Sequence, residues 1–219
     1  MRIKSFITTL VLVVFAHILL AQETPKNPPV NVEVLGSNRG LAFQQIINKK
    51  MKSVPRLGFF GVTNLVAEWD DRYVEDLMTQ GNLTFQIVKG LDLMGGFHLT
   101  NANGFCPTLG LIYTFSKPNF TMVLNPRFDV LKNGVFETFG MLEFRPKINE
   151  KFKFYGRLQG VYGEYLVSPK TLHARSYFVA RAGLTYREFN FGLGTNLDWY
   201  GPAKKNINSF GAFLGVALF

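Results

Sequence analysis

Histidine and serine are the residues of this chain whose chemistry could support catalysis, so their placement decides which reactions the sequence allows. Beyond the N-terminal apolar run the sequence contains two histidines, His98 and His173. A serine nucleophile needs a base within hydrogen-bond reach and a group that orients this base. Ser168 and Ser176 flank His173 inside SPKTLHARS, but neither lies in a recognised nucleophile motif. The sequence therefore predicts no catalytic residue, and an enzyme that modifies lipid or peptide through His98 or His173 is the least favoured alternative.

Metal and cofactor chemistry finds no support in the residue spacing either. The adjacent acids Asp70 and Asp71 could pair with a histidine, as in aspartate–histidine proteases, but two neighbouring acids in a loop are usually just solvated. Two histidines and the single cysteine, Cys106, are too widely spaced to match the ligands of a zinc site. We expect no metal and no cofactor. Cys106 has no partner for an internal disulfide, and we expect an inert thiol.

The elements that must position these residues are strands, because apolar residues recur at every second position. In 189–200, FNFGLGTNLDWY, five of the six odd positions are Phe, Leu or Trp, and the even positions from 190 to 198 are Asn, Gly or Asp. Strand side chains alternate between two faces, whereas helices repeat every 3.6 residues. The alternating segments are 57–69, 83–89, 91–100, 105–116, 119–130, 135–145, 151–163, 175–187, 189–200 and 207–219. The sequence thus predicts an all-β, antiparallel up-and-down transmembrane barrel of about ten strands, with eight as an alternative and a soluble β-sandwich as the competing fold.

The N-terminal 53 residues are predicted to lie outside this barrel. Arg2 and Lys4 precede an apolar stretch at 7–20, and Ala21 supplies a small residue for cleavage, so 1–21 has the features of a secretory signal peptide. Residues 22–53 are expected to form a periplasmic linker. Within it the segment 36–52 has the pattern of a short amphipathic helix, which could lie on the membrane surface, plug the barrel or bind a partner.

The chain ends on the uncharged segment GAFLGVALF, whose last residue is Phe219. A strand in a membrane must have its backbone groups paired, so such a segment suits a strand that closes a barrel. Here the sequence resembles the bacterial outer-membrane β-barrel proteins, whose closing strand carries a C-terminal phenylalanine recognised by the barrel-assembly machinery. The resemblance covers the signal peptide and residues 54–219. It implies location in the bacterial outer membrane, contact with lipid and lipopolysaccharide, and a role for Phe219 as an assembly signal.

Charged residues fall mainly on the face that the alternation assigns to the lumen. A turn at 146–150 would place Glu143 opposite Lys153. A two-residue turn at 188–189 would place Arg181 opposite Asn196 and diagonal to Asp198. Cross-strand pairs of opposite charge stabilise sheets. The predicted lumen network consists of Glu143, Lys153, Arg157, Arg181 and Asp198.

Tryptophan and tyrosine mark the expected rim of the barrel. Trp69 ends one predicted strand, and Trp199 with Tyr200 ends another of the same direction. Aromatic girdles form where a barrel crosses the membrane interface, so these three residues are predicted to form the outer girdle.

The predicted function follows from a narrow barrel filled by side chains. The first hypothesis is a non-enzymatic scaffold or accessory subunit of an envelope complex, with a protein partner and a largely closed lumen. The alternative is a narrow channel for small solutes, with a preference for anions if Arg and Lys dominate its lining. The formal net charge of +9 does not indicate nucleic acid, because the basic residues alternate with phenylalanine rather than form a cluster.

Overall fold

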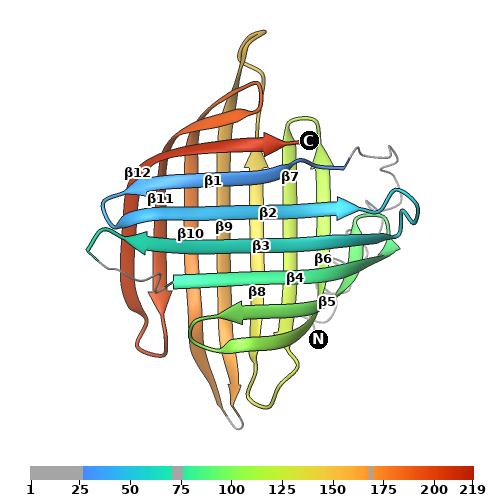
Figure 1. Ribbon diagram of the computed structural model, residues 1–219, viewed down its shortest axis with the longest axis vertical. Coiled ribbons are helices and arrows are strands. Elements are labelled where there is room, and N and C mark those ends of the chain that lie inside the picture. The colour runs from blue at the N-terminus through green and yellow to red at the C-terminus, as the bar shows by residue number, and fades with distance from the viewer. Residues whose placement is uncertain (1–26, 71–75, 168–169) are drawn as a thin grey trace, which may run out of the picture.

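The structure is a computed structural model that describes residues 27–70, 76–167 and 170–219. The predicted signal peptide at 1–21, Asp71 and Ser168 lie outside the described residues. In this part of the chain 12 antiparallel strands form one closed barrel (Figure 1). They are β1 (Val30–Ser37), β2 (Gly40–Lys50), β3 (Leu57–Glu68), β4 (Asp76–Val88), β5 (Leu91–Thr100), β6 (Gly104–Lys117), β7 (Phe120–Asp129), β8 (Val135–Phe144), β9 (Phe152–Val167), β10 (Lys170–Tyr186), β11 (Phe189–Tyr200) and β12 (Lys205–Leu218). None of the described residues belongs to a helix long and apolar enough to cross a membrane.

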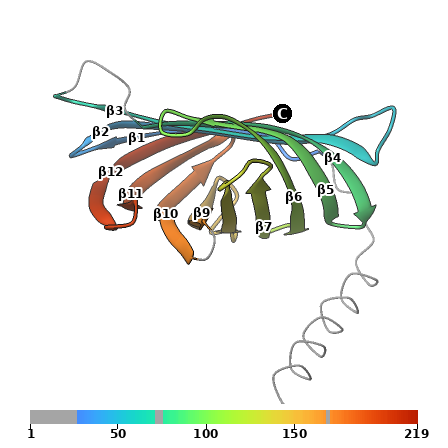
Figure 2. The ribbon, with the colours of Figure 1, turned by 90° about the horizontal axis from the view of Figure 1, so that it is seen from below.

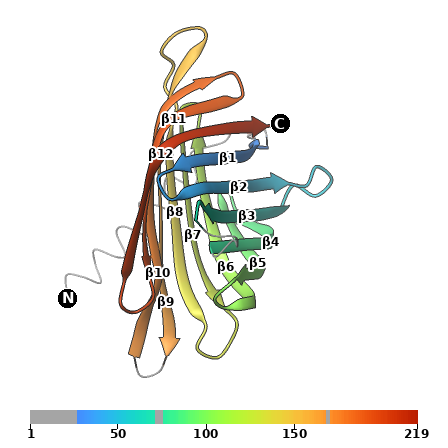
Figure 3. The same cartoon turned by 60° about the vertical axis from the view of Figure 1, so that its left-hand side comes forward.

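The strands are tilted against the barrel axis. In Figure 1 the wall that contains β1 to β4 lies in front, and the strands β8 to β10 of the opposite wall cross it. Figure 2 shows the same two walls from below, and Figure 3 shows β12 curving beside β1 where the chain closes the wall. Crossing of opposite walls is the expected geometry, because closure of a sheet requires every strand to tilt.

The period-two pattern gives the wall two faces of opposite character. In β9, Leu158 and Tyr162 are exposed on the outside, whereas Arg157, Gln159 and Val161 are buried inside. In β11, Phe191 and Leu193 are exposed, and Asn190 and Asp198 are buried. The predicted all-β barrel is therefore confirmed, with large apolar side chains outside and polar side chains within.

The predicted strand count and the predicted N-terminal helix are both wrong. Residues 30–50 form the hairpin of β1 and β2, so the barrel has 12 strands rather than ten or eight and begins before residue 54. Val34 of β1 pairs with Phe43 of β2 on one side and with Leu214 of β12 on the other. The helical pattern of this segment was misleading because a short apolar run fits either period. Barrel closure decides the outcome, since β12 needs β1 to pair its free edge.

Apolar side chains fill part of the lumen. One buried cluster draws residues from every strand between β2 and β10, so side chains from opposite walls meet within it. Its members are Ile46, Phe60, Val62, Met78, Met94, Ile112, Val123, Phe139, Met141, Val161, Tyr177 and Val179. We call this cluster the apolar layer. A layer of this kind makes the barrel interior a packed core rather than a wide aqueous pore.

Two rims bound the barrel. The terminal rim carries the start of β1 and the end of β12, where Val30 pairs with Leu218. The distal rim is the opposite one. Because the barrel runs up and down, every odd-numbered strand ends at the distal rim and every even-numbered strand begins there.

Candidate functional site

An ion pair crosses the full width of the lumen near the distal rim. Arg175 of β10 donates two hydrogen bonds to the carboxylate of Asp76 of β4, at 2.9 and 3.0 Å. These strands are six places apart in the ring of 12, so they stand on opposite walls. The same guanidinium bonds Asp198 Oδ1 at 2.9 Å and the Tyr200 hydroxyl at 3.2 Å. We call Asp76, Arg175, Asp198 and Tyr200 the distal cluster; its guanidinium faces two carboxylates.

A second cluster has the opposite charge balance. Glu33 Oε1 accepts a hydrogen bond from Arg157 Nη2 at 2.7 Å and another from Arg181 Nε at 2.8 Å. The three side chains are buried, with at most 6% of any of them exposed. One carboxylate thus serves two guanidiniums from neighbouring strands. We call Glu33, Arg157 and Arg181 the arginine cluster.

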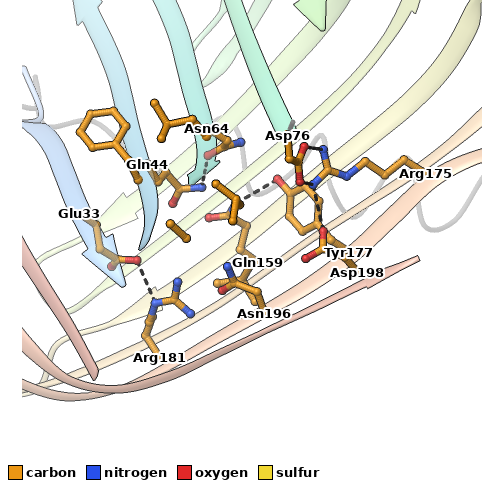
Figure 4. A pocket seen from close by; sticks show the side chains of 15 residues that line it. Glu33, Gln44, Asn64, Asp76, Gln159, Arg175, Tyr177, Arg181, Asn196 and Asp198 are labelled. Atoms are coloured by element: carbon orange, nitrogen blue, oxygen red, sulfur yellow. Dashed lines mark hydrogen bonds and ion pairs between the residues drawn. The ribbon is translucent and has the colours of Figure 1, made fainter. Parts of the chain in front are cut away.

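A cavity separates the two clusters, as Figure 4 shows. The cavity has a volume of about 50 Å³, counted as the space that the centre of a water molecule can occupy. This volume is enough for a few waters. Residues of both clusters line it, together with the amides of Gln44, Asn64, Gln159 and Asn196. The side-chain oxygens of Gln44, Gln159 and Asn196 are buried and have no hydrogen-bond partner in the protein. Buried polar groups normally bind a partner, so these oxygens indicate that water or solute occupies the cavity.

The remaining lumen charges are paired. Arg127 binds both Asp129 and Glu137, and the other pairs are Arg39 with Glu68, Lys50 with Asp92, and Arg145 with Glu143. In the turn between β1 and β2, burial acts to lower the pKa of Arg39, but hydrogen bonds to Tyr200 and Glu68 outweigh it and raise the pKa above its usual value. Every basic side chain of this set therefore has a carboxylate partner.

The predicted pairings within the lumen network are wrong in register. Glu143 lies opposite Arg157, not Lys153, and Lys153 is exposed. Arg181 lies opposite Gly194 rather than Asn196, and its carboxylate partner is Glu33 rather than Asp198. The reason is turn geometry. The turn after β10 holds Arg187 and Glu188, with Arg187 at φ 52°, so Tyr186 pairs with Phe189 and all later pairs shift by two positions.

The predicted aromatic girdle divides between the two faces of the wall. Trp69 follows β3 at the distal rim, is 59% exposed, and donates its indole hydrogen to the carbonyl of Ser37 at 2.9 Å. Trp199 lies near the distal end of β11, on the face opposite to the buried Asp198. Tyr200 instead points into the lumen, where its hydroxyl donates to Asp76. Adjacent strand residues face opposite sides, so Trp199 and Tyr200 cannot share one girdle.

Phe219 follows β12 at the terminal rim and is 91% exposed. The strand before it pairs with β1 from Gly211 to Leu218. Its terminal position thus remains accessible, and its predicted role in assembly stays a prediction.

His173 and Ser176 are brought together on the outer face at the distal rim. The Nε2 atom of His173 lies 3.0 Å from Ser176 Oγ, and its Nδ1 lies 2.7 Å from the carbonyl of Gly201. A bulge in β10 between His173 and Arg175 causes this. Arg175 and Ser176 point to opposite faces, and the bulge turns His173 to the side of Ser176 and of the exposed Tyr162. Sequence spacing alone does not reveal such a bulge.

The other residues that could take part in catalysis or metal binding do not form a site. His98 is buried in the lumen, with its Nδ1 atom 3.9 Å from Asp129 Oδ1. Cys106 is a buried free thiol. Among the residues that the structure describes, no group of three or more potential ligands could hold a metal ion.

Sequence reasoning missed Glu33 and Asp76. Glu33 lies in the segment predicted as a linker, and Asp76 lies between two predicted strands. The alternation in VNVEVLG, 30–36, with Glu33 buried and Val32 on the other face, was the signal that could have identified the first strand.

The sequence matches no protein-family model and no curated protein. Among solved structures, the NanC porin superposes with a TM-score of 0.51 at 12% identity, over 87% of this chain and 99% of the porin. The chain has the fold of a bacterial outer-membrane β-barrel. LpxR from Salmonella typhimurium superposes with a TM-score of 0.45 at 7% identity, over 87% of this chain and 99% of the LpxR chain. OccK2 from Pseudomonas aeruginosa superposes with a TM-score of 0.39 at 12% identity, over 77% of this chain and 63% of the OccK2 chain. At these identities the likeness concerns the fold alone.

Proposed function

We propose that the chain is an integral protein of the bacterial outer membrane that acts as a narrow channel for small polar solutes. The observation that carries this proposal is the lumen cavity with its unpartnered amide oxygens. An unpaired buried polar group costs about 1–3 kcal/mol, so the three oxygens that line the cavity favour a lumen that holds water or solute there. Water or a solute in the cavity removes this cost.

The apolar layer is the proposed constriction of the channel. Hydrophobic constrictions restrict conduction by excluding water, so we expect small and intermittent currents. We assign the channel no preference for anions, because the positive excess of the arginine cluster is opposed by the negative excess of the distal cluster and the other basic side chains described above are paired.

Planar-bilayer recording of the purified protein tests the proposal. Phe60 contributes to the apolar layer and is 1% exposed, so Phe60→Ala is expected to widen the constriction and increase the single-channel current several-fold. Phe210→Ala, on the outer face, is the matched control and is expected to leave the current unchanged. Absence of current from the wild type and from Phe60→Ala would overturn the channel and favour a closed scaffold subunit.

The outer face of the barrel supports the proposed location. Leucine and phenylalanine side chains such as Leu83, Leu193, Phe210 and Leu214 are about 60% exposed. Apolar surface on this scale needs lipid or a partner, because soluble monomers rarely expose large apolar patches. We therefore propose contact with outer-membrane lipid, with lipopolysaccharide at the distal rim, and recognition of Phe219 by the barrel-assembly machinery.

A second candidate function is supported by the His173–Ser176 pair on the outer face at the distal rim, where His173 is 8% exposed and Ser176 is half-buried. If His173 donates from Nδ1 to the Gly201 carbonyl, Nε2 is free to accept the Ser176 hydroxyl proton. Ser176 Oγ would then attack an ester carbonyl, Nε2 would pass the proton to the leaving alcohol, and water would release the acid. The outward orientation favours an acyl ester of a membrane lipid as substrate.

A fluorophosphonate probe tests this candidate, because it reacts covalently with an activated serine. The wild type in detergent micelles is expected to be labelled, and His173→Gln and Ser176→Ala are expected to lose the label. Ser209→Ala, which removes a buried serine elsewhere in the barrel, is the matched control. A wild type that stays unlabelled and releases no fatty acid from phospholipid would rule out the hydrolase.

A further inference from the structure

We propose that the lumen cavity binds a zwitterionic solute, with its ammonium group at Asp76 and Asp198 and its carboxylate at Arg181. This inference rests on the proposed channel and deepens it by naming the class of solute. The three charged residues line the cavity, and Figure 4 shows them on two sides of it with the amides of Gln159 and Asn196 between.

The two ends of the cavity differ in net charge. In the distal cluster Arg175 is bound by two carboxylates, which leaves one negative charge in excess. In the arginine cluster Glu33 is bound by two guanidiniums, which leaves one positive charge in excess. Charges inside a protein are less screened than charges in water, so the cavity lies in a field directed from one end to the other. A molecule with one charge is attracted at one end and repelled at the other, whereas a zwitterion is attracted at both.

The middle of the cavity selects for hydrogen-bond donors. Gln159 is 2% exposed, and its side-chain amide nitrogen donates to the Tyr177 hydroxyl at 3.0 Å. Its amide oxygen has no partner, and the same holds for the oxygens of Gln44 and Asn196. A solute that places N–H groups or its hydration water along this row satisfies these oxygens.

The spacing of the two ends sets the length of the solute. Gly194 lies opposite Arg181, and a methyl group on Gly194 would come within 2.6 Å of Arg181 Cδ, so the arginine side chain extends over this glycine. Asp198 is four residues farther along β11, at about 13 Å for a strand rise of about 3.3 Å per residue. An extended ω-amino acid or a short peptide reaches both ends, whereas glycine reaches one.

Isothermal titration calorimetry of the full-length protein in detergent micelles tests the inference with 6-aminohexanoate as probe. Hexanoate and hexylammonium carry the same chain with one charge each, and glycine is the short zwitterion. We expect 6-aminohexanoate to bind at one site, about tenfold more tightly than any of the three, since charge-assisted hydrogen bonds form at both ends. Equal binding of hexanoate, or absence of binding by the wild type, would overturn the inference.

Variants test whether the solute binds in the cavity rather than elsewhere in the lumen. Asp198→Asn keeps a hydrogen-bond acceptor for Arg175 and removes one carboxylate charge, so 6-aminohexanoate should lose its advantage over hexanoate. Asp76→Asn provides a second substitution at the same end. Asp92→Asn is the matched control, because this carboxylate binds Lys50 and does not line the cavity. An equal loss of binding in Asp92→Asn would contradict the assignment. Because binding is measured without a membrane, its failure is distinguishable from a failure to conduct.

Discussion

At the scale of single residues, Glu33 is the carboxylate that compensates two buried arginines. Its carboxylate is the partner of both Arg157 and Arg181, and all three side chains are almost completely buried. Glu33→Gln would leave two guanidiniums without a carboxylate. Loss of one partner from a buried ion pair typically destabilises a protein by about 3–5 kcal/mol, so the free energy of unfolding should fall by about this amount.

Denaturant titration of the detergent-solubilised protein measures the effect of Glu33→Gln. Glu150→Gln is the control, because Glu150 forms an exposed ion pair with Lys147, and exposed pairs contribute little. Similar unfolding midpoints for the wild type and Glu33→Gln would show that water, rather than Glu33, compensates the two arginines.

At the scale of strands, the seam between β1 and β12 closes the barrel and depends on a glycine. A methyl group on Gly211 would lie 1.9 Å from the carbonyl oxygen of Gly36 and 2.7 Å from Ser37 Cα. These are backbone atoms of the paired strand and cannot move aside cheaply. Gly211→Ala should therefore push the seam apart and destabilise the barrel by about 1–3 kcal/mol, the usual cost of overpacking.

Gly140→Ala is the control for the seam, because a methyl group on Gly140 meets no atom within 4 Å. Samples are held at increasing temperatures and run on a detergent gel without boiling. The fraction that still migrates as a compact barrel measures the stability of the seam. An unchanged melting temperature for Gly211→Ala would show that β1 and β12 can separate without cost to the barrel.

The ten strands from β3 to β12 were readable from the sequence, whereas β1, β2 and the pairing of the strands were not. The alternation of FNFGLGTNLDWY depends only on neighbouring residues, and β11 has the predicted bounds, Phe189–Tyr200. The contact between Glu33 and Arg181 joins residues 148 positions apart. It depends on the turn at Arg187, on the Arg181–Gly194 register and on the first hairpin, and the sequence pattern specified none of these. Errors in the predicted site follow from register, because a shift of two residues keeps a side chain on its face but changes its partner.

At the scale of the whole molecule, the outward apolar face determines the solvent in which the barrel is stable. We expect the purified chain to fold in detergent micelles or lipid vesicles and to aggregate in buffer alone, because its exposed leucines and phenylalanines would then meet water. Circular dichroism and light scattering with and without detergent measure this. A folded, monodisperse monomer in plain buffer would overturn the membrane assignment and the channel with it.

A charge on this face tests the assignment more sharply. Leu193 lies in the middle of β11 and is 59% exposed. A lysine on the lipid face of a barrel costs about 2–4 kcal/mol at the midplane and much less near the interface. Leu193→Lys should therefore reduce the yield of folding into vesicles but not into small micelles, whose polar surface is closer to the side chain. Leu131→Lys, in the distal turn between β7 and β8, is the control, since Leu131 is similarly exposed but lies beyond the strands. Equal yields for the two variants in vesicles would place the membrane elsewhere on the barrel.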